Sequence, residues 1–232
     1  TRQALRIPFA VLACMGLLAL ASWLWGALPS TLSLSAVGTL AAAAVLAAAG
    51  ARVGATGSSA GQRVFEAFCL AWVVAGLLNA GVGAVQVFAP GWADGEWIAR
   101  SAIPGRAVGN LRQPNHLCTL LLWAMVATVA LRAGGRLRPV PATSILLVLT
   151  LGLVLTASRT AVLGIGLMAV WGLIDRRLPG RLRLTLLAGP LAYALCWAGM
   201  AAWADWSRAT FGGQQRLAEA DLSASRFRIW SD

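Results

Sequence analysis

The apolar residues of this chain fall into seven long blocks separated by short polar segments. A bilayer has a hydrocarbon layer ~30 Å thick, which takes about 20 residues of α-helix to cross. Because lipid leaves the backbone groups of an open strand edge unsatisfied, a block that enters it must be helical. The sequence therefore predicts an all-α, polytopic transmembrane helix bundle over residues 1–206, with spans near 7–28, 32–51, 64–89, 117–131, 142–157, 160–174 and 184–206.

The composition excludes an ordinary water-soluble domain. Hydrophobic residues make up 59% of the chain and charged residues 12%, whereas soluble domains carry about 25% charged residues. The formal net charge of +11 would also suit a nucleic-acid-binding protein. However, the basic residues, all arginines, sit in short clusters between apolar blocks rather than along one soluble face. We therefore expect no nucleic acid among the partners.

Arginine positions predict the topology. Residues 142–174 would make a single tilted helix about 50 Å long. Splitting this block at Arg159 places the arginines of 175–183 on the same side as those of 52–63 and 132–141, as the positive-inside rule favours. We therefore predict two short helices meeting at a buried Arg159, cytoplasmic segments 52–63, 132–141 and 175–183, and the opposite side for 90–116 and 207–232.

Eight arginines on that opposite side are not explained by topology. An arginine at mid-membrane costs about 2.5–3.5 kcal/mol on insertion scales and is by default a functional candidate. Arg159 fits this description, and Thr156, Ser158 and Thr160 beside it favour a shallow hydrated pocket. The alternative is an arginine that snorkels to the interface. The eight residues are Arg100, Arg106, Arg112, Arg159, Arg208, Arg216, Arg226 and Arg228.

A second group of polar residues, in the segment 106–116, directly precedes the apolar block at 117–131. Arg106, Arg112, Gln113 and Asn115 supply fixed donors around one helix N-terminus, an arrangement that suits phosphate or sugar oxygens. The structural alternative is that Pro114 merely opens the helix and its polar neighbours sit at the membrane interface. The spacing of His, Cys, Asp and Glu predicts no metal site and no glycosidase-type carboxylate pair.

Three motifs together resemble a known superfamily. They are Gly-Asn-Leu-Arg-Gln-Pro-Asn-His at 109–116, Ser-Arg-Thr at 158–160 and Ser-Arg-Phe-Arg-Ile-Trp at 225–230. In this order they resemble the bacterial O-antigen ligase and protein O-oligosaccharyltransferase superfamily, which includes the O-antigen polymerases. The resemblance covers roughly residues 60–232, and the first motif looks most like the protein O-oligosaccharyltransferase branch.

The resemblance implies a multi-pass glycosyltransferase of the bacterial inner membrane that works at the periplasmic face without a metal or other cofactor. The donor would be a glycan on undecaprenyl pyrophosphate. The acceptor would be a hydroxyl of a protein Ser or Thr, favoured here, or of a lipid A-core sugar in lipopolysaccharide biosynthesis. By resemblance Arg159 and Arg226 would hold the pyrophosphate. From their place at a helix N-terminus, we expect Arg112, Gln113 and Asn115 to shape the glycan or phosphate entrance, and Arg106 is a further candidate for substrate binding.

The sequence assigns no catalytic residue. In the superfamily, the general-base histidine belongs to a large periplasmic loop further along the chain, and residues 207–232 would be the start of that loop. We therefore do not assign the general-base role to His116. His116 as the base is kept as the alternative. We accordingly expect the fragment alone to be inactive. The alternative function is a transporter or lipid flippase. The small number of intramembrane charged residues disfavours it, because Glu66 and Asn79 alone make a poor ion or proton relay.

Overall fold

The computed structural model describes residues 2–25, 30–55 and 59–214, and no strand occurs among them. The chain divides into two compact units, residues 1–67 and 68–232, which are treated separately below. The helices are α1 (Arg2–Trp25), α2 (Ser30–Ala55), α3 (Ser59–Phe88), α4 (Pro114–Ala133), α5 (Pro139–Thr156), α6 (Arg159–Ile174), α7 (Gly180–Leu187) and α8 (Gly189–Ser207), with short 3-10 helices η1 (Pro90–Trp92) and η2 (Gly109–Leu111).

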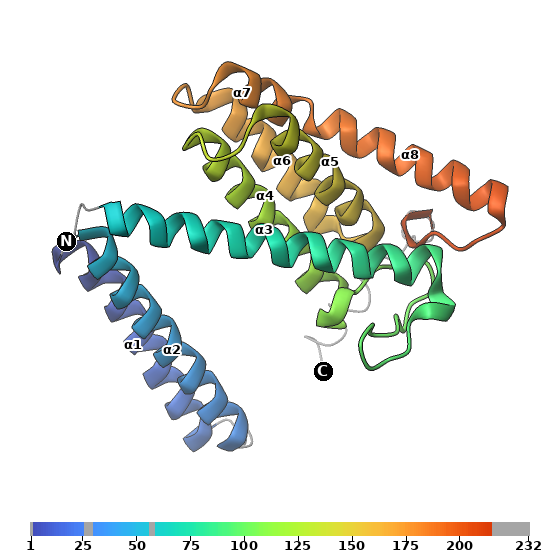
Figure 1. Cartoon of the computed structure of the whole chain (residues 1–232). Helices are drawn as coiled ribbons and strands as arrows, with labels where there is room; N and C mark the ends of the chain where they lie inside the picture. The colour runs from blue at the N-terminus through green and yellow to red at the C-terminus, as the bar shows by residue number, and fades with distance from the viewer. Residues whose placement is uncertain (1, 26–29, 56–58, 215–232) are drawn as a thin grey trace. The chain divides into compact units, whose positions relative to one another are not determined.

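The first unit is a helical hairpin. Helices α1 and α2 lie side by side along their length (Figure 1). Most of their described apolar side chains are exposed, including Ile7, Leu17, Val45 and Leu46. A surface of this kind is stable against lipid rather than water, as the hydropathy of these blocks predicts.

The second unit packs α4, α5, α6, α7 and α8 together with the part of α3 that follows Ala67, which contributes Ala80 and Val87 to the core. Its core is built from leucines of α4 and α5, of which Leu117, Leu121, Leu149 and Leu153 are fully buried. Small residues let these helices approach closely. A Cβ added at Gly164 on α6 would lie 2.5 Å from the Leu122 side chain of α4, the kind of glycine-mediated helix contact that is common in membranes.

Among the residues that the structure describes, four helices are long and apolar enough to cross a membrane: α2, α3, α4 and α5. The bent pair α7 and α8 would raise the number to five if it forms one span. Helix α6 has 16 residues, or about 24 Å at 1.5 Å per residue, and the apolar part of α1 is also short. The polytopic helical class is thus confirmed, whereas the count of about seven spans is not.

One predicted helix is broken in the structure. The block at 184–206 contains the end of α7 and most of α8, which are bent by 41° relative to each other. The bend falls next to Pro190, in the first turn of α8. A proline lacks an N–H and clashes with the carbonyl four residues before it, so a continuous helix through Leu186 and Pro190 is disfavoured.

The chain also breaks between α5 and α6. Helix α5 ends at Thr156, Ala157 adopts a left-handed conformation with φ of 48°, and α6 begins at Arg159. The expectation that Arg159 is buried is wrong, because its side chain is exposed. The buried residue of the junction is Ser158, which is 4% exposed. Arg159 is the first residue of α6, and its long side chain extends to the surface. The short side chain of Ser158, the residue before it, is buried.

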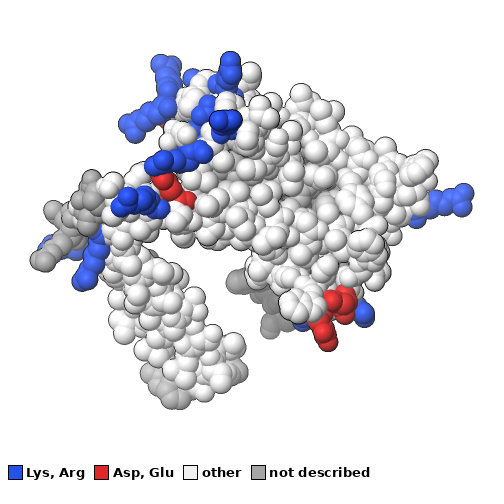
Figure 2. All heavy atoms as spheres, viewed as in Figure 1, with Lys and Arg blue, Asp and Glu red and all other residues white. Residues whose placement is uncertain are grey.

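The second unit has two chemically different ends. Because α4, α5 and α6 follow one another through short turns, the turns 134–138 and 175–179 lie at one end, below called the arginine end. Residues 89–113 and the α5–α6 junction lie at the other, the loop end (Figure 1). Arginine side chains gather over α7 and its neighbouring turns in Figure 2. That the arginine end faces the cytoplasm stays a prediction.

Candidate functional site

The loop end is shaped by residues 89–113, which connect α3 to α4 and are folded by their own hydrogen bonds. One carboxylate oxygen of Asp94 accepts from the backbone N–H groups of Glu96, Trp97 and Ile98, at 2.9, 2.9 and 3.0 Å. These donors, Ile98 first, hold the pKa of Asp94 below its ordinary value because they favour the ionised form. Asp94 therefore fixes a tight turn at the tip of the loop.

Gln86, in the last turn of α3, attaches this loop to the helix bundle. Its side chain is 4% exposed. The amide oxygen accepts from the backbone N–H groups of Val108 and Gly109, both at 2.9 Å. The amide nitrogen donates to the carbonyl oxygens of Ala99, at 2.5 Å, and Gly109, at 3.1 Å. One buried side chain thus holds two separate stretches of the loop.

Two asparagines extend this attachment. The side chain of Asn110 accepts from the Ala99 N–H at 3.0 Å and donates to the Trp97 carbonyl at 2.8 Å. Its backbone N–H donates to Asn79 Oδ1 of α3 at 3.2 Å. Gly109 fits between them with φ of 59°, and a Cβ there would lie 2.9 Å from Asn79 Oδ1. Only glycine combines this backbone conformation with so close an approach.

Arg106 connects the loop to the end of α5. Its side chain is 7% exposed, and its Nε and Nη2 donate to the carbonyl oxygens of Thr156 and Ala157, at 3.1 and 3.4 Å. The adjacent Ala107 N–H donates to the Leu155 carbonyl at 2.8 Å. Such contacts neutralise the partial negative charge of a helix C-terminus. Arg106 therefore has a structural role at the α5–α6 junction.

The start of α4 is fixed by the Arg-Gln-Pro-Asn motif. Gln113 is the N-cap residue, and its Oε1 accepts from the His116 N–H at 2.7 Å. Pro114 occupies the first turn, where its missing N–H costs nothing. Arg112 precedes the helix in a left-handed conformation with φ of 56°, and its guanidinium donates to the Gly95 carbonyl at 3.3 Å. The arginine thereby also supports the Asp94 turn.

The structure joins two motifs that are 43 residues apart in the chain. Ser158 Oγ donates to Asn115 Oδ1 at 2.9 Å. Ser158 is also the N-cap residue of α6, but it makes no side-chain capping bond to that helix. The N-termini of α4 and α6 consequently meet at the loop end. Each helix N-terminus carries a partial positive charge of roughly half a unit.

The predicted site residues are thus largely gathered. Arg112, Asn115 and Arg159 are exposed at the loop end, and Gln113 is half-buried beside them. Arg226 lies outside the described residues, as do Arg216 and Arg228. Within residues 2–25, 30–55 and 59–214, no three His, Cys, Asp or Glu side chains are grouped so as to hold a metal ion.

Sequence reasoning missed Gln86 and the supporting role of Asn79. Both are polar residues inside an apolar block, and they are seven positions apart. This spacing puts them on one face of a helix, two turns apart. A pair of amides on one face of an apolar helix indicates a structured polar partner beside that helix, which was the available signal.

Comparison with known protein families gives a match to part of the chain. Residues 107–131 match a family model described as protein glycosylation ligase. The chain is similar there to protein glycosylation ligases. The matched stretch contains the end of the loop formed by residues 89–113 and most of α4, including Arg112, Gln113 and Asn115. It points to a glycosylation-related function and to an oligosaccharyltransferase type of enzyme in general. No curated protein matches the chain, and no solved structure does either.

Proposed function

We propose that the protein to which this chain belongs is a glycosyltransferase of the bacterial inner membrane. It would move a glycan from undecaprenyl pyrophosphate to a hydroxyl acceptor at the periplasmic face, with a protein Ser or Thr favoured over a lipid A-core sugar. The observation that carries this proposal is the Asn115–Ser158 hydrogen bond of 2.9 Å. It joins the glycosylation-ligase match at 107–131 to the Ser-Arg pair at 158–159.

The charge distribution at this junction suits a pyrophosphate. Two helix N-termini meet there, and the exposed guanidinium groups of Arg112 and Arg159 lie at the start of α4 and α6. Helix N-termini and arginine forks both bind phosphate oxygens. When the glycosidic bond to the carrier breaks, negative charge grows on the leaving pyrophosphate, and fixed donors stabilise it in the transition state. A resident metal ion is not required for that step.

The roles differ among the six predicted site residues. Arg112 and Arg159 would contact phosphate oxygens, and Gln113 and Asn115 would shape the glycan or phosphate entrance while they fix the two helix starts. Arg106 would act indirectly, since its guanidinium is bonded to carbonyls of the α5 end. Arg226 keeps the pyrophosphate role that the resemblance implies. The hydroxyl acceptor needs a base to take its proton, and we assign none within this chain.

The test is glycan transfer from purified undecaprenyl-pyrophosphate-linked donor by the full-length protein. Arg159→Ala removes the guanidinium, and Arg159→Lys keeps the charge but loses the planar fork. A lost charge-assisted bond costs about 1.5–3 kcal/mol, or roughly ten- to a hundredfold in rate. We expect both variants to lose activity by this factor. The matched control is Arg176→Ala, an exposed arginine of the opposite end, with membrane abundance measured for all variants.

A second pair of variants separates the entrance from the phosphate contact. The Gln113→Ala, Asn115→Ala protein should use the donor less efficiently, with a higher KM, while its membrane insertion is unchanged. Normal transfer by this double variant would leave the motif with a purely structural role. Near-normal transfer by Arg159→Ala and Arg226→Ala at normal abundance would remove the pyrophosphate site and favour the transport alternative.

A further inference from the structure

Trp97 presents its indole ring to solvent at the loop end. Its side chain is 82% exposed, in the connection between α3 and α4. Trp203 of α8, in contrast, packs edge-on against Phe88. Trp197 packs in the same way against Phe211. An exposed indole offers a flat apolar face and a polar N–H at its edge, and tryptophan is enriched at binding interfaces for this reason.

The position of Trp97 in the chain argues against a role as a membrane anchor. Tryptophans of the interfacial belt lie where a helix leaves the hydrocarbon layer. Trp206, which is 84% exposed in the last turn of α8, has such a position. Trp97 instead lies nine positions past Phe88, the last residue of α3. The exposed charged residues Glu96 and Arg100 are close to it in the chain and favour an aqueous setting.

The backbone of Trp97 is fixed although its side chain is exposed. Its N–H donates to Asp94 Oδ1 at 2.9 Å, and its carbonyl accepts from the Asn110 side chain at 2.8 Å. The Gly95 N–H donates to the Ile98 carbonyl at 2.9 Å and closes the turn. A ring carried by such a turn loses little conformational entropy when a ligand binds, and this preorganisation favours affinity.

Arg112 contacts the same turn. Its guanidinium donates to the carbonyl of Gly95 at 3.3 Å, two positions before Trp97 in the chain. One small turn therefore carries the exposed indole and also contacts the exposed arginine that we propose for the pyrophosphate. On a lipid-linked glycan, the first sugar is bonded directly to the pyrophosphate. The phosphate and the first sugars of one donor molecule can thus contact Arg112 and Trp97 together.

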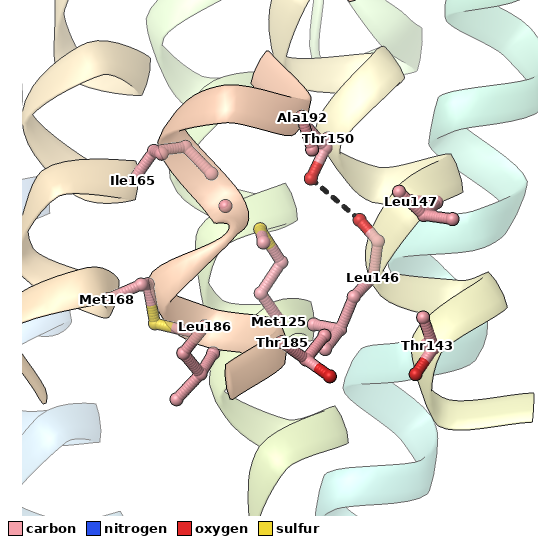
Figure 3. A pocket seen from close by; sticks show the side chains of 11 residues that line it. Met125, Thr143, Leu146, Leu147, Thr150, Ile165, Met168, Thr185, Leu186 and Ala192 are labelled. Carbon is pink, nitrogen blue, oxygen red and sulfur yellow. Dashed lines mark hydrogen bonds between the residues drawn. The ribbon is translucent and has the colours of Figure 1, made fainter. Parts of the chain in front are cut away.

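A cavity among α4, α5, α6, α7 and α8 is not an alternative place for a sugar (Figure 3). It holds about 30 Å³, roughly the space of one water molecule. Its wall is largely apolar, with Met125, Leu146 and Met168 among the lining residues. A pyranose ring is several times larger, and its hydroxyl groups would be left without partners there. A glycan is therefore expected at the surface of the loop end rather than in this cavity.

We propose that Trp97 is a stacking platform for the first sugar rings of the lipid-linked glycan. This inference rests on the proposed glycan transfer and adds a sugar-binding residue to it. The C–H bonds on one face of a pyranose ring carry a small positive charge, which fits the negative face of an indole. The exposed carboxylate of Glu96, the preceding residue, is a hydrogen-bond acceptor for sugar hydroxyls.

The experiment compares two lipids for binding to the full-length protein in phosphatidylcholine nanodiscs. One is undecaprenyl pyrophosphate that carries a single N-acetylglucosamine, and the other is undecaprenyl pyrophosphate alone. The ratio of their dissociation constants isolates the sugar contribution, because the carrier and the phosphates are common to both. We expect the wild type to bind the sugar-bearing lipid about fivefold more tightly, the effect of one aromatic stacking contact. Trp97→Leu should abolish this preference.

Two further tryptophan variants serve as controls. Trp97→Phe keeps a flat aromatic face and should keep most of the preference. Trp206→Leu removes a similarly exposed indole at the same end of the unit and should bind both lipids as the wild type does. Because both indoles are exposed, all three variants should keep the wild-type unfolding midpoint and membrane abundance. Membrane anchoring would instead lower the abundance of both leucine variants and leave the ratio of dissociation constants unchanged.

Arg159→Ala separates this inference from the proposed function. It should weaken the binding of both lipids by the same factor and leave their ratio intact. If the wild type binds neither lipid, or if Arg159→Ala binds both as the wild type does, the proposed pyrophosphate site fails and the platform fails with it. If Arg159→Ala loses affinity but Trp97→Leu keeps the wild-type ratio, only the platform is refuted. Equal affinity of the wild type for the two lipids would refute the platform as well.

Discussion

Replacing Gln86 by methionine tests whether one buried amide fixes the loop formed by residues 89–113. Methionine is close to glutamine in length and volume, so packing is largely kept while the hydrogen bonds to Val108, Gly109 and Ala99 are removed. Four bonds are involved in total, counting both those to Gly109. The variant separates the polar role of this residue from its role as a space-filling side chain.

The expected magnitude follows from these bonds. A hydrogen bond contributes about 0.5–1.5 kcal/mol net, and a buried polar group left without a partner costs about 1–3 kcal/mol. Water can replace part of the loss at the loop surface, which gives a local destabilisation of roughly 2–4 kcal/mol for Gln86→Met. Since about 1.4 kcal/mol corresponds to a tenfold change in an equilibrium constant, the open state of the loop should become roughly 30- to several hundredfold more populated.

Hydrogen exchange of the full-length protein in nanodiscs measures this opening directly. Amides of residues 99–110 should lose protection in Gln86→Met, while those in the middle of α5 should not change. The control is Gln62→Met, since Gln62 is exposed and its side chain bonds only to Glu66 one turn away. Unchanged protection at Val108 and Gly109 in the Gln86 variant would refute the assignment of this residue as the attachment of the loop.

Three further predictions concern the two ends of the second unit. Asn115→Ala and Ser158→Ala should show a coupling of about 0.5–1.5 kcal/mol in a double-mutant cycle of thermal unfolding, and simple additivity would contradict their bond. The lowered pKa of Asp94 contributes stability that is present above the unfolded-state pKa of about 3.9 and lost as pH falls through the folded value. The difference in unfolding midpoint between wild type and Asp94→Asn should therefore shrink from pH 7 to pH 3, and a constant difference would count against the turn. In a cysteine-free background, a cysteine at Gly180 should be labelled from the cytoplasm alone, and periplasmic labelling would reverse the predicted topology.

Hydropathy predicted the polytopic, all-helical class because a bilayer-spanning helix needs a long apolar run, and such a run is visible in the sequence itself. It did not predict the break between α7 and α8. Leu186 and Pro190 both lie in an apolar block, and hydropathy does not register a missing N–H. Hydropathy also did not predict the number of spans. Helix α6 is apolar, but its 16 residues are fewer than the roughly 20 that cross a bilayer.

The polar framework of the site was harder to predict, because it depends on which helix ends are neighbours. Sequence reasoning grouped Gln113 and Asn115 with a ligand, whereas both also hold helix starts, Gln113 by capping α4 and Asn115 by bonding to Ser158. A motif therefore shows which donors are available, but not how many of them the fold itself uses.

Arg106 illustrates this limit and sharpens the proposed site. In the sequence, Arg106 and Arg112 are equally good candidates for binding an anion, because both are arginines of the same polar motif. The partners of Arg106, the carbonyls of Thr156 and Ala157, are 50 and 51 residues away, and they become acceptors only because α5 ends there. A guanidinium whose N–H groups are bonded to the carbonyls of a helix C-terminus has fewer donors left for a phosphate, and the negative end of the helix dipole weakens its attraction for an anion. Among the arginines that the structure describes at this site, the exposed Arg112 and Arg159 are therefore the ones that we propose for the pyrophosphate contact. Arg106→Ala should lower the unfolding midpoint and leave the KM for the donor nearly unchanged.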